Sequence, residues 1–274
     1  MDAYRTFYET VGAHYPEEEI VYRTLSGRLR RAFIFNIIKH WEGRLLDIGC
    51  NGGVYLKEYR GGEKVGLDIS WHVLARVRRQ DPKIPLVVAD AQGLKCFRDC
   101  TFDFILCSEV LEHVHSPESV LKGIFALLKP GGQALITTPN YHRVRPFWTE
   151  IGVLKKFGVP GIKGNFYIHT AFRPEELARM GEEIGFSCVS KGTFEKEVRY
   201  ARKCPALLFL VFQFFNRRTF RSVHLDWINQ KIYENLTLLV YTFFKALGLV
   251  PLLNQWVSEG VRTYVIFQKP METQ

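Results

Sequence analysis

The feature that most constrains the fold is a regular alternation of short apolar runs and helix-like segments between residues 44 and 138. Each run has five or six residues and is rich in Leu, Ile and Val, which is typical of strands buried on both faces. Strands that alternate with helices pair in parallel, because each helix returns the chain across one face of the sheet. The runs are 45–49, 64–69, 86–90, 102–107 and 133–138, and the helix-like segments are 54–59, 71–80 and 117–128.

Further segments flank this alternation on both sides. Residues 1–42 are predicted to be helical, because apolar residues recur every fourth position from Leu29 to Trp41. Two strand-like runs, 186–194 and 263–267, follow much later in the chain. Between those two runs, residues 196–260 combine an apolar stretch with apolar residues at helical spacing, which predicts a helical insertion.

The net charge of +9 comes almost entirely from the second half of the chain. Residues 1–140 carry 18 basic and 17 acidic residues, whereas residues 141–274 carry 19 basic and 11 acidic residues and 14 of the 21 Phe. Basic residues beside Phe are typical of a nucleic-acid site or of an element that contacts a membrane surface. An aromatic core under a basic, solvated surface is the third interpretation.

Composition excludes a disordered chain, because 47% of the residues are hydrophobic and require a core. No apolar run approaches the roughly 20 residues of a bilayer-crossing helix. The first residues, including Asp2, Tyr4 and Arg5, lack the apolar stretch of a secretory signal. We therefore expect a cytoplasmic protein, with peripheral contact to a membrane as an option.

A glycine-rich turn, DIGCNGG at residues 47–53, ends the first predicted strand and opens a helix. Glycines in such a turn let the backbone approach a ligand closely, and the helix start offers unpaired N–H groups. Asn51 occupies a position where a dinucleotide-binding turn requires Gly. Because Asn tolerates a positive φ, we expect the turn to form nevertheless.

Acidic residues end the first three predicted strands, at Asp47, Asp68 and Asp90. These ends meet at one edge of a parallel sheet, where open α/β sheets bind ligands. Asp68 is placed to accept from both hydroxyls of a ribose, and Asp90 with Ala91 is placed to read an adenine edge. Asp47 would repel a pyrophosphate and suits a ligand that carries an ammonium group.

These segments resemble the class I S-adenosylmethionine-dependent methyltransferases, in particular the type 11 subgroup with a Glu-x-x-Glu-His segment and the polyprenyl-catechol O-methyltransferases similar to it. The resemblance implies an α/β fold with a Rossmann-like seven-stranded sheet, its last strand antiparallel and helices on both faces. The matching segments are LLDIGCNGG, VGLDIS, VVADAQGL, FDFILCSEVLEHV and LLKPGGQALITTPN, with FRPEELARMGEEIGF and RTYVIFQK at the far edge.

We expect three parts in the chain on this basis. Residues 1–42 form an N-terminal helical segment, and residues 43–195 with 261–274 form the Rossmann-like methyltransferase domain. Within it, residues 141–172 are a substrate-side insertion. Residues 196–260 are a helical insertion, apolar and basic, before the last strand.

The resemblance also implies a site for S-adenosyl-L-methionine. The glycine turn and Asp47 would hold the methionine moiety, Asp68 the ribose, and Asp90 with Ala91 the adenine. Tyr15 resembles an aromatic residue that caps the donor in related chains. The complete expected set is Tyr15, Asp47, Gly49, Cys50, Asn51, Gly52, Gly53, Asp68, Ile69, Ser70, Asp90, Ala91, Gln92, Ser108 and Glu109.

The segment EVLEH at residues 109–113 supports two hypotheses. Glu109 and Glu112 would share one face of a predicted helix start. With His113 and His169 they would form an oxygen and nitrogen set suited to a divalent cation such as Mg²⁺ or Mn²⁺. Alternatively, the segment holds no metal, and His113 is a catalytic base that removes a proton from a substrate hydroxyl, or simply packs near the donor.

The function predicted from these features is methyl transfer to an apolar or lipid-linked small molecule, with O-methylation as the favoured chemistry. The acceptor would lie under residues 141–170 and 196–254, whose Phe-rich walls suit an apolar molecule. An RNA-modifying methyltransferase is an alternative, although no separate RNA-binding module is visible. A non-catalytic, donor-binding scaffold protein is another.

Overall fold

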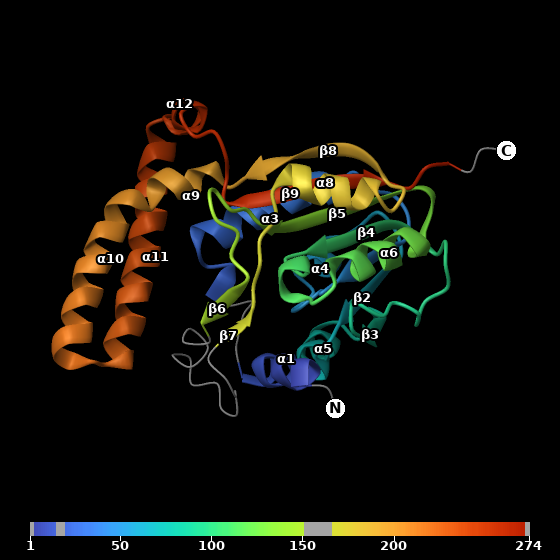
Figure 1. Ribbon diagram of the computed structural model, residues 1–274, viewed down its shortest axis with the longest axis horizontal. Coiled ribbons are helices and arrows are strands. Elements are labelled where there is room, and N and C mark those ends of the chain that lie inside the picture. Colours follow the sequence, from blue (N-terminus) through green and yellow to red (C-terminus); the bar gives the residue numbers. More distant parts are fainter. Residues whose placement is uncertain (1–2, 15–19, 151–165, 272–274) are drawn as a thin grey trace.

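A seven-stranded sheet forms the centre of the molecule (Figure 1). The computed structural model describes residues 3–14, 20–150 and 166–271. The strand order is β3-β2-β1-β4-β5-β9-β8, with β9 antiparallel to both of its neighbours and the first five strands parallel. This confirms the predicted Rossmann-like sheet. The strands are β1 (Leu45–Ile48), β2 (Lys64–Asp68), β3 (Leu86–Val88), β4 (Phe102–Ser108), β5 (Leu128–Pro139), β8 (Ser187–Phe194) and β9 (Arg262–Gln268).

Helices cover both faces of the sheet. Neighbouring residues of a strand point to opposite faces, so one strand contributes apolar side chains to both sides. Leu46 of β1 belongs to one apolar cluster with residues of α6 and α8, whereas Leu45 packs in a second cluster with residues of α3 and α4. The strands are therefore buried on both sides, as their apolar runs predict. The helices are α3 (Leu25–Ile38), α4 (Val54–Glu58), α5 (Trp71–Gln80), α6 (Pro117–Leu127) and α8 (Pro174–Glu182).

Strand β5 begins five residues before the predicted run at 133–138. Leu128 already pairs with Phe102 of β4, and pairing resumes at Gln133 after a register shift. Gly131, with a φ of +79°, lies in this irregular part of β5. The chain therefore enters the sheet directly after α6, before the glycine pair at 131–132.

Two segments extend from the sheet. The first is α1 (Ala3–His14), which packs against α5. The second runs through α9 (Lys196–Ala201), α10 (Lys203–Phe215), the short helix η2 (Asn216–Phe220), α11 (Val223–Ala246) and α12 (Val250–Gln255). In Figure 1, α10 and α11 form a hairpin that projects beside the sheet. None of the helices in the described ranges is both long enough and apolar enough to span a bilayer.

The predicted substrate-side insertion is described only in part. Strands β6 (Trp148–Glu150) and β7 (Phe166–Ile168) pair antiparallel in a separate small sheet. Residues 151–165 between them lie outside the described residues. The described part ends at His169–Ala171, which brings the chain back toward the carboxyl edge of the main sheet, where Thr170 N–H donates to the carbonyl of Glu112 over 3.0 Å.

Candidate functional site

The glycine turn after β1 adopts the backbone that its sequence predicts. Gly49, Asn51 and Gly53 have φ values of +70°, +43° and +68°. Asn51 is thus left-handed, which confirms that the turn forms with Asn in place of Gly. At Gly49, any Cβ would overlap the side chain of Val110, so glycine is required there for a steric reason as well.

In the described part of the chain, Asp47 carries a carboxylate oxygen without a partner at this edge of the sheet. Its side chain is buried, and Oδ2 has no hydrogen-bond partner among the described residues. Burial, together with the nearby charge of Asp68, raises the pKa of Asp47 well above its usual value. A buried acid with an unused oxygen is suited to a cationic ligand, because a positive charge offsets the cost of burying the carboxylate.

Asp68, at the end of β2, joins the turn to the start of α5. Oδ2 accepts the N–H of Asn51 over 3.1 Å, and Oδ1 accepts the N–H of Ser70 over 2.9 Å. Burial raises the pKa of Asp68 to about 6, although these hydrogen bonds act in the opposite direction. The backbone N–H of Ile69 also acts on this carboxylate, which still retains acceptor capacity for a ligand hydroxyl.

The loop after β3 is held by its own side chains. The backbone N–H of Gln92 donates to Oδ1 of Asp90 over 2.9 Å, and Oε1 of Gln92 accepts the N–H of Ser116 over 3.0 Å. Ala91 between them is buried. These bonds link the end of β3 to the start of α6 and fix the loop beside the glycine turn.

Glu109 follows β4 and lies in an ionic network. Its φ is +58°, and its Oε2 is 2.7 Å from both Nη1 of Arg30 and Nε of Arg262. Thr137, whose hydroxyl is 2.9 Å from that of Ser108, donates to Oε1. Burial alone would raise the pKa of Glu109, but the charges of Arg262 and Arg30 hold it below its usual value.

Three of the four predicted metal ligands come together. Glu112, His113 and His169 each offer a ligand atom within 4.8 Å of the others. Oε2 of Glu112 and Nδ1 of His169 are buried, with no hydrogen-bond partner among the described residues. Glu109 is directed toward the arginines instead. The prediction that Glu109 and Glu112 share one face of a helix is wrong. Glu112 lies in a short 3₁₀ helix, η1 (Leu111–His113), whereas Glu109 precedes it and has a left-handed backbone conformation.

His113 has a defined orientation. Nδ1 lies 3.3 Å from the carbonyl oxygen of Ile168. Burial lowers the pKa of His113 to about 4, with His169 contributing in the same direction. The ring is therefore neutral at pH 7, and donation from Nδ1–H to Ile168 leaves Nε2 as an acceptor.

Helix α1 is part of this site, although none of its residues is among those expected from the sequence. Glu9 accepts from the N–H of Trp71 over 3.0 Å and from the hydroxyl of Ser70 over 2.9 Å. The ring centroids of Tyr8 and His113 are 5.9 Å apart, and those of Phe7 and Tyr167 are 5.5 Å apart. Helix α1 therefore covers the carboxyl edge of the sheet. Tyr15, the predicted cap, lies outside the described residues.

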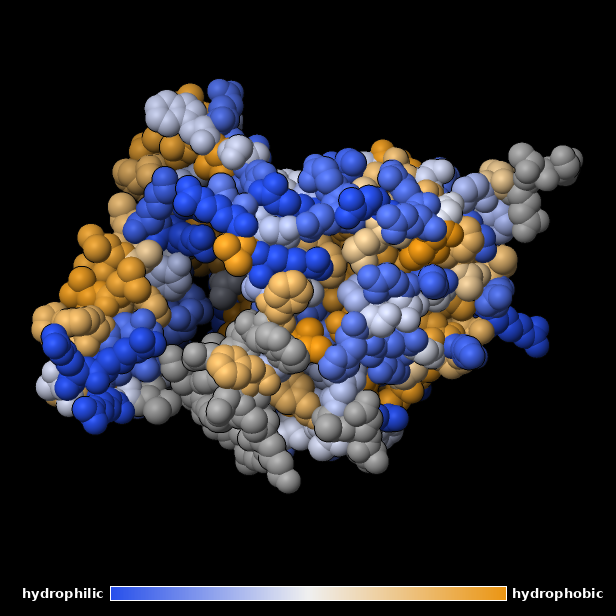
Figure 2. Space-filling model, in the orientation of Figure 1, coloured by the Kyte–Doolittle hydropathy of each residue, from blue (hydrophilic) through white to orange (hydrophobic). Residues whose placement is uncertain are grey.

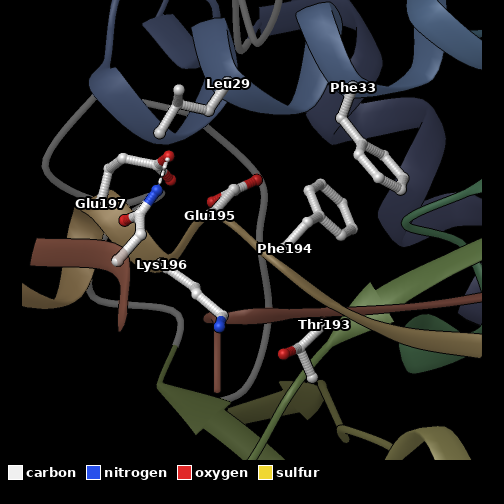
Figure 3. A pocket seen from close by; sticks show the side chains of 8 residues that line it. Leu29, Phe33, Thr193, Phe194, Glu195, Lys196 and Glu197 are labelled. Atoms are coloured by element: carbon white, nitrogen blue, oxygen red, sulfur yellow. Dashed lines mark hydrogen bonds between the residues drawn. The ribbon is translucent and has the colours of Figure 1, made fainter. Parts of the chain in front are cut away.

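Glu195 is a buried carboxyl group that was not among the residues expected from the sequence. It is buried at the start of α9, with a φ of +63°, and accepts a hydrogen bond from the hydroxyl of Ser26. Figure 3 shows it between Leu29 of α3 and Phe194 at the end of β8, beside a cavity of 240 Å³. Burial raises the pKa of Glu195 to about 7, although the positive charge of Arg262 acts to lower it.

The strand order and the acid-lined turn at its carboxyl edge define the class of S-adenosylmethionine-dependent methyltransferases. Residues 19–191 match a family described as a methyltransferase domain, and the chain belongs to this family.

Among sequence relatives, the ubiquinone biosynthesis O-methyltransferase of Aeromonas salmonicida (strain A449) is 32% identical over 149 residues, which are 52% of this chain and 62% of that protein. The protein of the same name from Chromobacterium violaceum is 29% identical over 149 residues, covering 52% of this chain and 63% of that one. The chain thus spans less than two thirds of the length of these relatives.

Solved structures show the same fold. The S-adenosylmethionine-dependent methyltransferase from Mesorhizobium loti aligns with a TM-score of 0.54 and 16% identity, over 86% of this chain and 95% of that chain. The Haemonchus contortus phosphoethanolamine N-methyltransferase 2, in complex with S-adenosyl-L-methionine, aligns with a TM-score of 0.55 and 16% identity. That alignment covers 99% of this chain and 61% of the other.

Proposed function

We propose that this chain transfers the methyl group of S-adenosyl-L-methionine to an oxygen atom of an apolar or lipid-linked small molecule. The observation that carries the proposal is the buried carboxylate of Asp47, whose Oδ2 is unused beside the glycine turn. The ammonium group of the donor matches this carboxylate in charge. The similarity to O-methyltransferases of ubiquinone biosynthesis supports a lipid-like acceptor.

The remaining donor contacts follow from the same edge of the sheet. In the proposal, the backbone from Gly49 to Gly53 surrounds the methionine moiety with Ser108 nearby. Asp68 accepts from the ribose hydroxyls, and the segment from Asp90 to Gln92 contacts the adenine. When bound, the donor supplies an electrophilic methyl group on a sulfonium. The residues of the chain hold it in line with the acceptor, and positioning of this kind contributes most to the rate of a displacement.

The acceptor is proposed to lie between η1, β7 and α1. Phe7, Tyr8 and Tyr167 supply aromatic walls there, and their rings are already in contact with each other or with His113. His113 presents Nε2 as an acceptor and can remove the proton of a hydroxyl group before the methyl group arrives. This arrangement favours a phenolic or enolic hydroxyl on an apolar ring.

A divalent cation is a second candidate for the same place. The unpartnered oxygen of Glu112 and nitrogen of His169, with His113 beside them, fit a cation with mixed oxygen and nitrogen ligands. Such an ion would orient an acceptor hydroxyl. Calorimetric titration with Mn²⁺ tests the candidate, since a saturable heat that disappears in Glu112→Gln supports it and the absence of any heat excludes it.

The proposed reaction is tested with donor labelled in the methyl group, incubated with a lipid extract and, separately, with total RNA. We expect label in the lipid fraction, and a loss of at least tenfold in turnover for His113→Ala with donor affinity unchanged. His115→Ala is the matched control. Label in RNA alone would favour the RNA-modifying alternative, and no label in either fraction would favour a donor-binding scaffold.

A further inference from the structure

Helix α10 exposes an apolar surface that is continuous around more than half of its circumference. From Leu207 to Phe215, seven exposed positions fall in one arc of roughly 200°, at about 100° per residue. All seven are apolar, and their side chains are 40% to 67% exposed. They are Leu207, Leu208, Leu210, Val211, Phe212, Phe214 and Phe215. A solvated helix of a globular protein presents polar residues on such an arc, so this surface is unusual.

The neighbouring elements add to this apolar surface. On α11 and at its C-cap, the exposed apolar residues recur at intervals of seven, four and four, which places them in one stripe. They are Ile232, Leu239, Phe243 and Leu247. Phe220, in η2 at the tip of the hairpin, is 68% exposed. Figure 2 shows the hydrophobic colour gathered over the α10 side of the hairpin, with hydrophilic residues at its lower tip.

Positively charged residues flank the apolar arc of α10 at both ends. Arg202 and Lys203 lie at its start, and Arg217, Arg218 and Arg221 follow its end. All five side chains are exposed, and residues 202–222 contain no Asp or Glu. Within the described ranges, none of the five forms an ion pair with an acid. At the start of α10, Arg202 and Lys203 line a cavity of 540 Å³ together with Arg199 and Glu259. At the tip of the hairpin, the guanidinium of Arg218 lies over the ring of Phe214 at 5.2 Å.

We propose that the α10–α11 hairpin docks on the surface of an anionic lipid bilayer. Charge complementarity favours an anionic bilayer over a second copy of the chain as the binding partner. In a two-fold dimer both copies contribute the same patch, so ten cations would gather around one interface, and residues 202–222 offer no acid to pair with them. An anionic bilayer instead offers acyl chains to the apolar arc and negative headgroups to both ends.

The dimensions of α10 agree with an orientation in the plane of the membrane. Its 13 residues extend about 20 Å. This is shorter than the hydrocarbon thickness of about 30 Å. Cations at both ends of the helix can then reach headgroups of the same leaflet, while the apolar arc lies at the boundary with the acyl chains.

This inference rests on the proposed function for its purpose, because docking would bring a lipid-linked acceptor to the enzyme. Its physical basis, however, is confined to residues 202–247. The test therefore uses neither donor nor acceptor. Vesicle binding can fail while methyl transfer succeeds, and the reverse outcome is equally distinguishable.

Vesicle sedimentation with the full chain tests the proposal. We expect at least tenfold stronger binding to phosphatidylcholine vesicles that contain phosphatidylglycerol than to phosphatidylcholine alone. Leu208→Ser with Phe215→Ser should lose at least tenfold in binding, and so should Arg217→Glu with Arg218→Glu. Circular dichroism and thermal unfolding verify that each variant is folded.

Matched controls alter the same chemistry elsewhere on the surface. Arg78→Glu with Arg79→Glu makes the same charge change at the end of α5, and Val189→Ser with Met271→Ser removes exposed apolar groups from the opposite end of the sheet. Both should bind as the unmodified protein does. Equal binding to neutral and anionic vesicles, or no binding at all, overturns the proposal. A dimer in sedimentation velocity that the Leu208/Phe215 variant dissociates, without vesicle binding, would identify a second copy as the occupant instead.

Discussion

At the scale of residues, the site concentrates buried acids that differ in what they already bind. Asp47 keeps an unused oxygen, Asp68 accepts two backbone N–H groups, and Glu109 is neutralised by two arginines. The first two therefore retain capacity for a ligand, whereas Glu109 is committed to the protein. This difference separates the proposed donor contacts from the structural ionic network.

Substitution of Asp68 tests the ribose contact. Asp68→Asn keeps the size of the side chain but removes the charge and one acceptor oxygen. We expect donor binding to weaken by about 1–3 kcal/mol, as for the loss of charge-assisted hydrogen bonds. Calorimetry measures the change, and Asp81→Asn, an acid at the end of α5, is the control. Unchanged affinity in Asp68→Asn would contradict the ribose assignment.

Glu195 predicts a pH dependence of stability. Its pKa is about 7 in the folded chain against 4.5 in the unfolded chain. The folded state thus holds this proton more tightly, and its contribution to stability, full below pH 4.5, is lost as pH rises through 7. Glu195→Gln removes this decline, so the variant should gain stability over the unmodified protein between pH 5 and pH 8.

The gain should be at most about 3 kcal/mol. Urea unfolding at pH 5 and at pH 8 measures the gain, and Glu197→Gln, two residues further along the chain in α9, is the control. If the difference between Glu195→Gln and the unmodified protein is the same at both pH values, the buried carboxyl does not titrate as described.

At the scale of elements, α1 closes the site by an approach that needs glycine. A Cβ on Gly12 would overlap the hydroxyl of Ser70 at the start of α5, where Glu9 also bonds. We expect Gly12→Val to push α1 outward and to speed donor dissociation several-fold, with the unfolding temperature little changed. Stopped-flow displacement measures the rate.

Ala13→Val is the control, because Ala13 is adjacent and exposed, and the variant adds the same β-branched side chain to α1 on its solvent side. Equal dissociation rates in the two variants would show that α1 does not retain the donor.

The elements of the sheet were predictable because their signals are local. Buried parallel strands are continuous apolar runs, and the left-handed turn at Asn51 follows from residue type. The network of Glu109 with Arg30 and Arg262 was not predictable, because it joins α3, the end of β4 and the start of β9. Contacts over such separations depend on packing. For α1, the spacing of Tyr4, Phe7 and Tyr8 on one helix face was a signal that could have indicated a covering helix.

At the scale of the whole molecule, the uneven charge has a structural location. The half that carries the proposed donor site is nearly neutral, whereas the positive excess is concentrated in the second half and includes the cations of the α10–α11 hairpin. The sheet with acids at its carboxyl edge and the basic, apolar α10–α11 hairpin are thus separate parts of the molecule. In this account the first part binds the donor and the second brings the enzyme to its acceptor.

The molecule should bind S-adenosyl-L-methionine at the carboxyl edge of the sheet, against the buried carboxylate of Asp47. Calorimetric titration of the full chain with this donor measures the binding. We expect saturable one-to-one binding, and at least tenfold weaker binding in Asp47→Asn, because the amide lacks the negative charge that pairs with the ammonium group of the donor. No saturable binding, or equal affinity in Asp47→Asn and the unmodified protein, would show that the donor does not bind at this carboxylate.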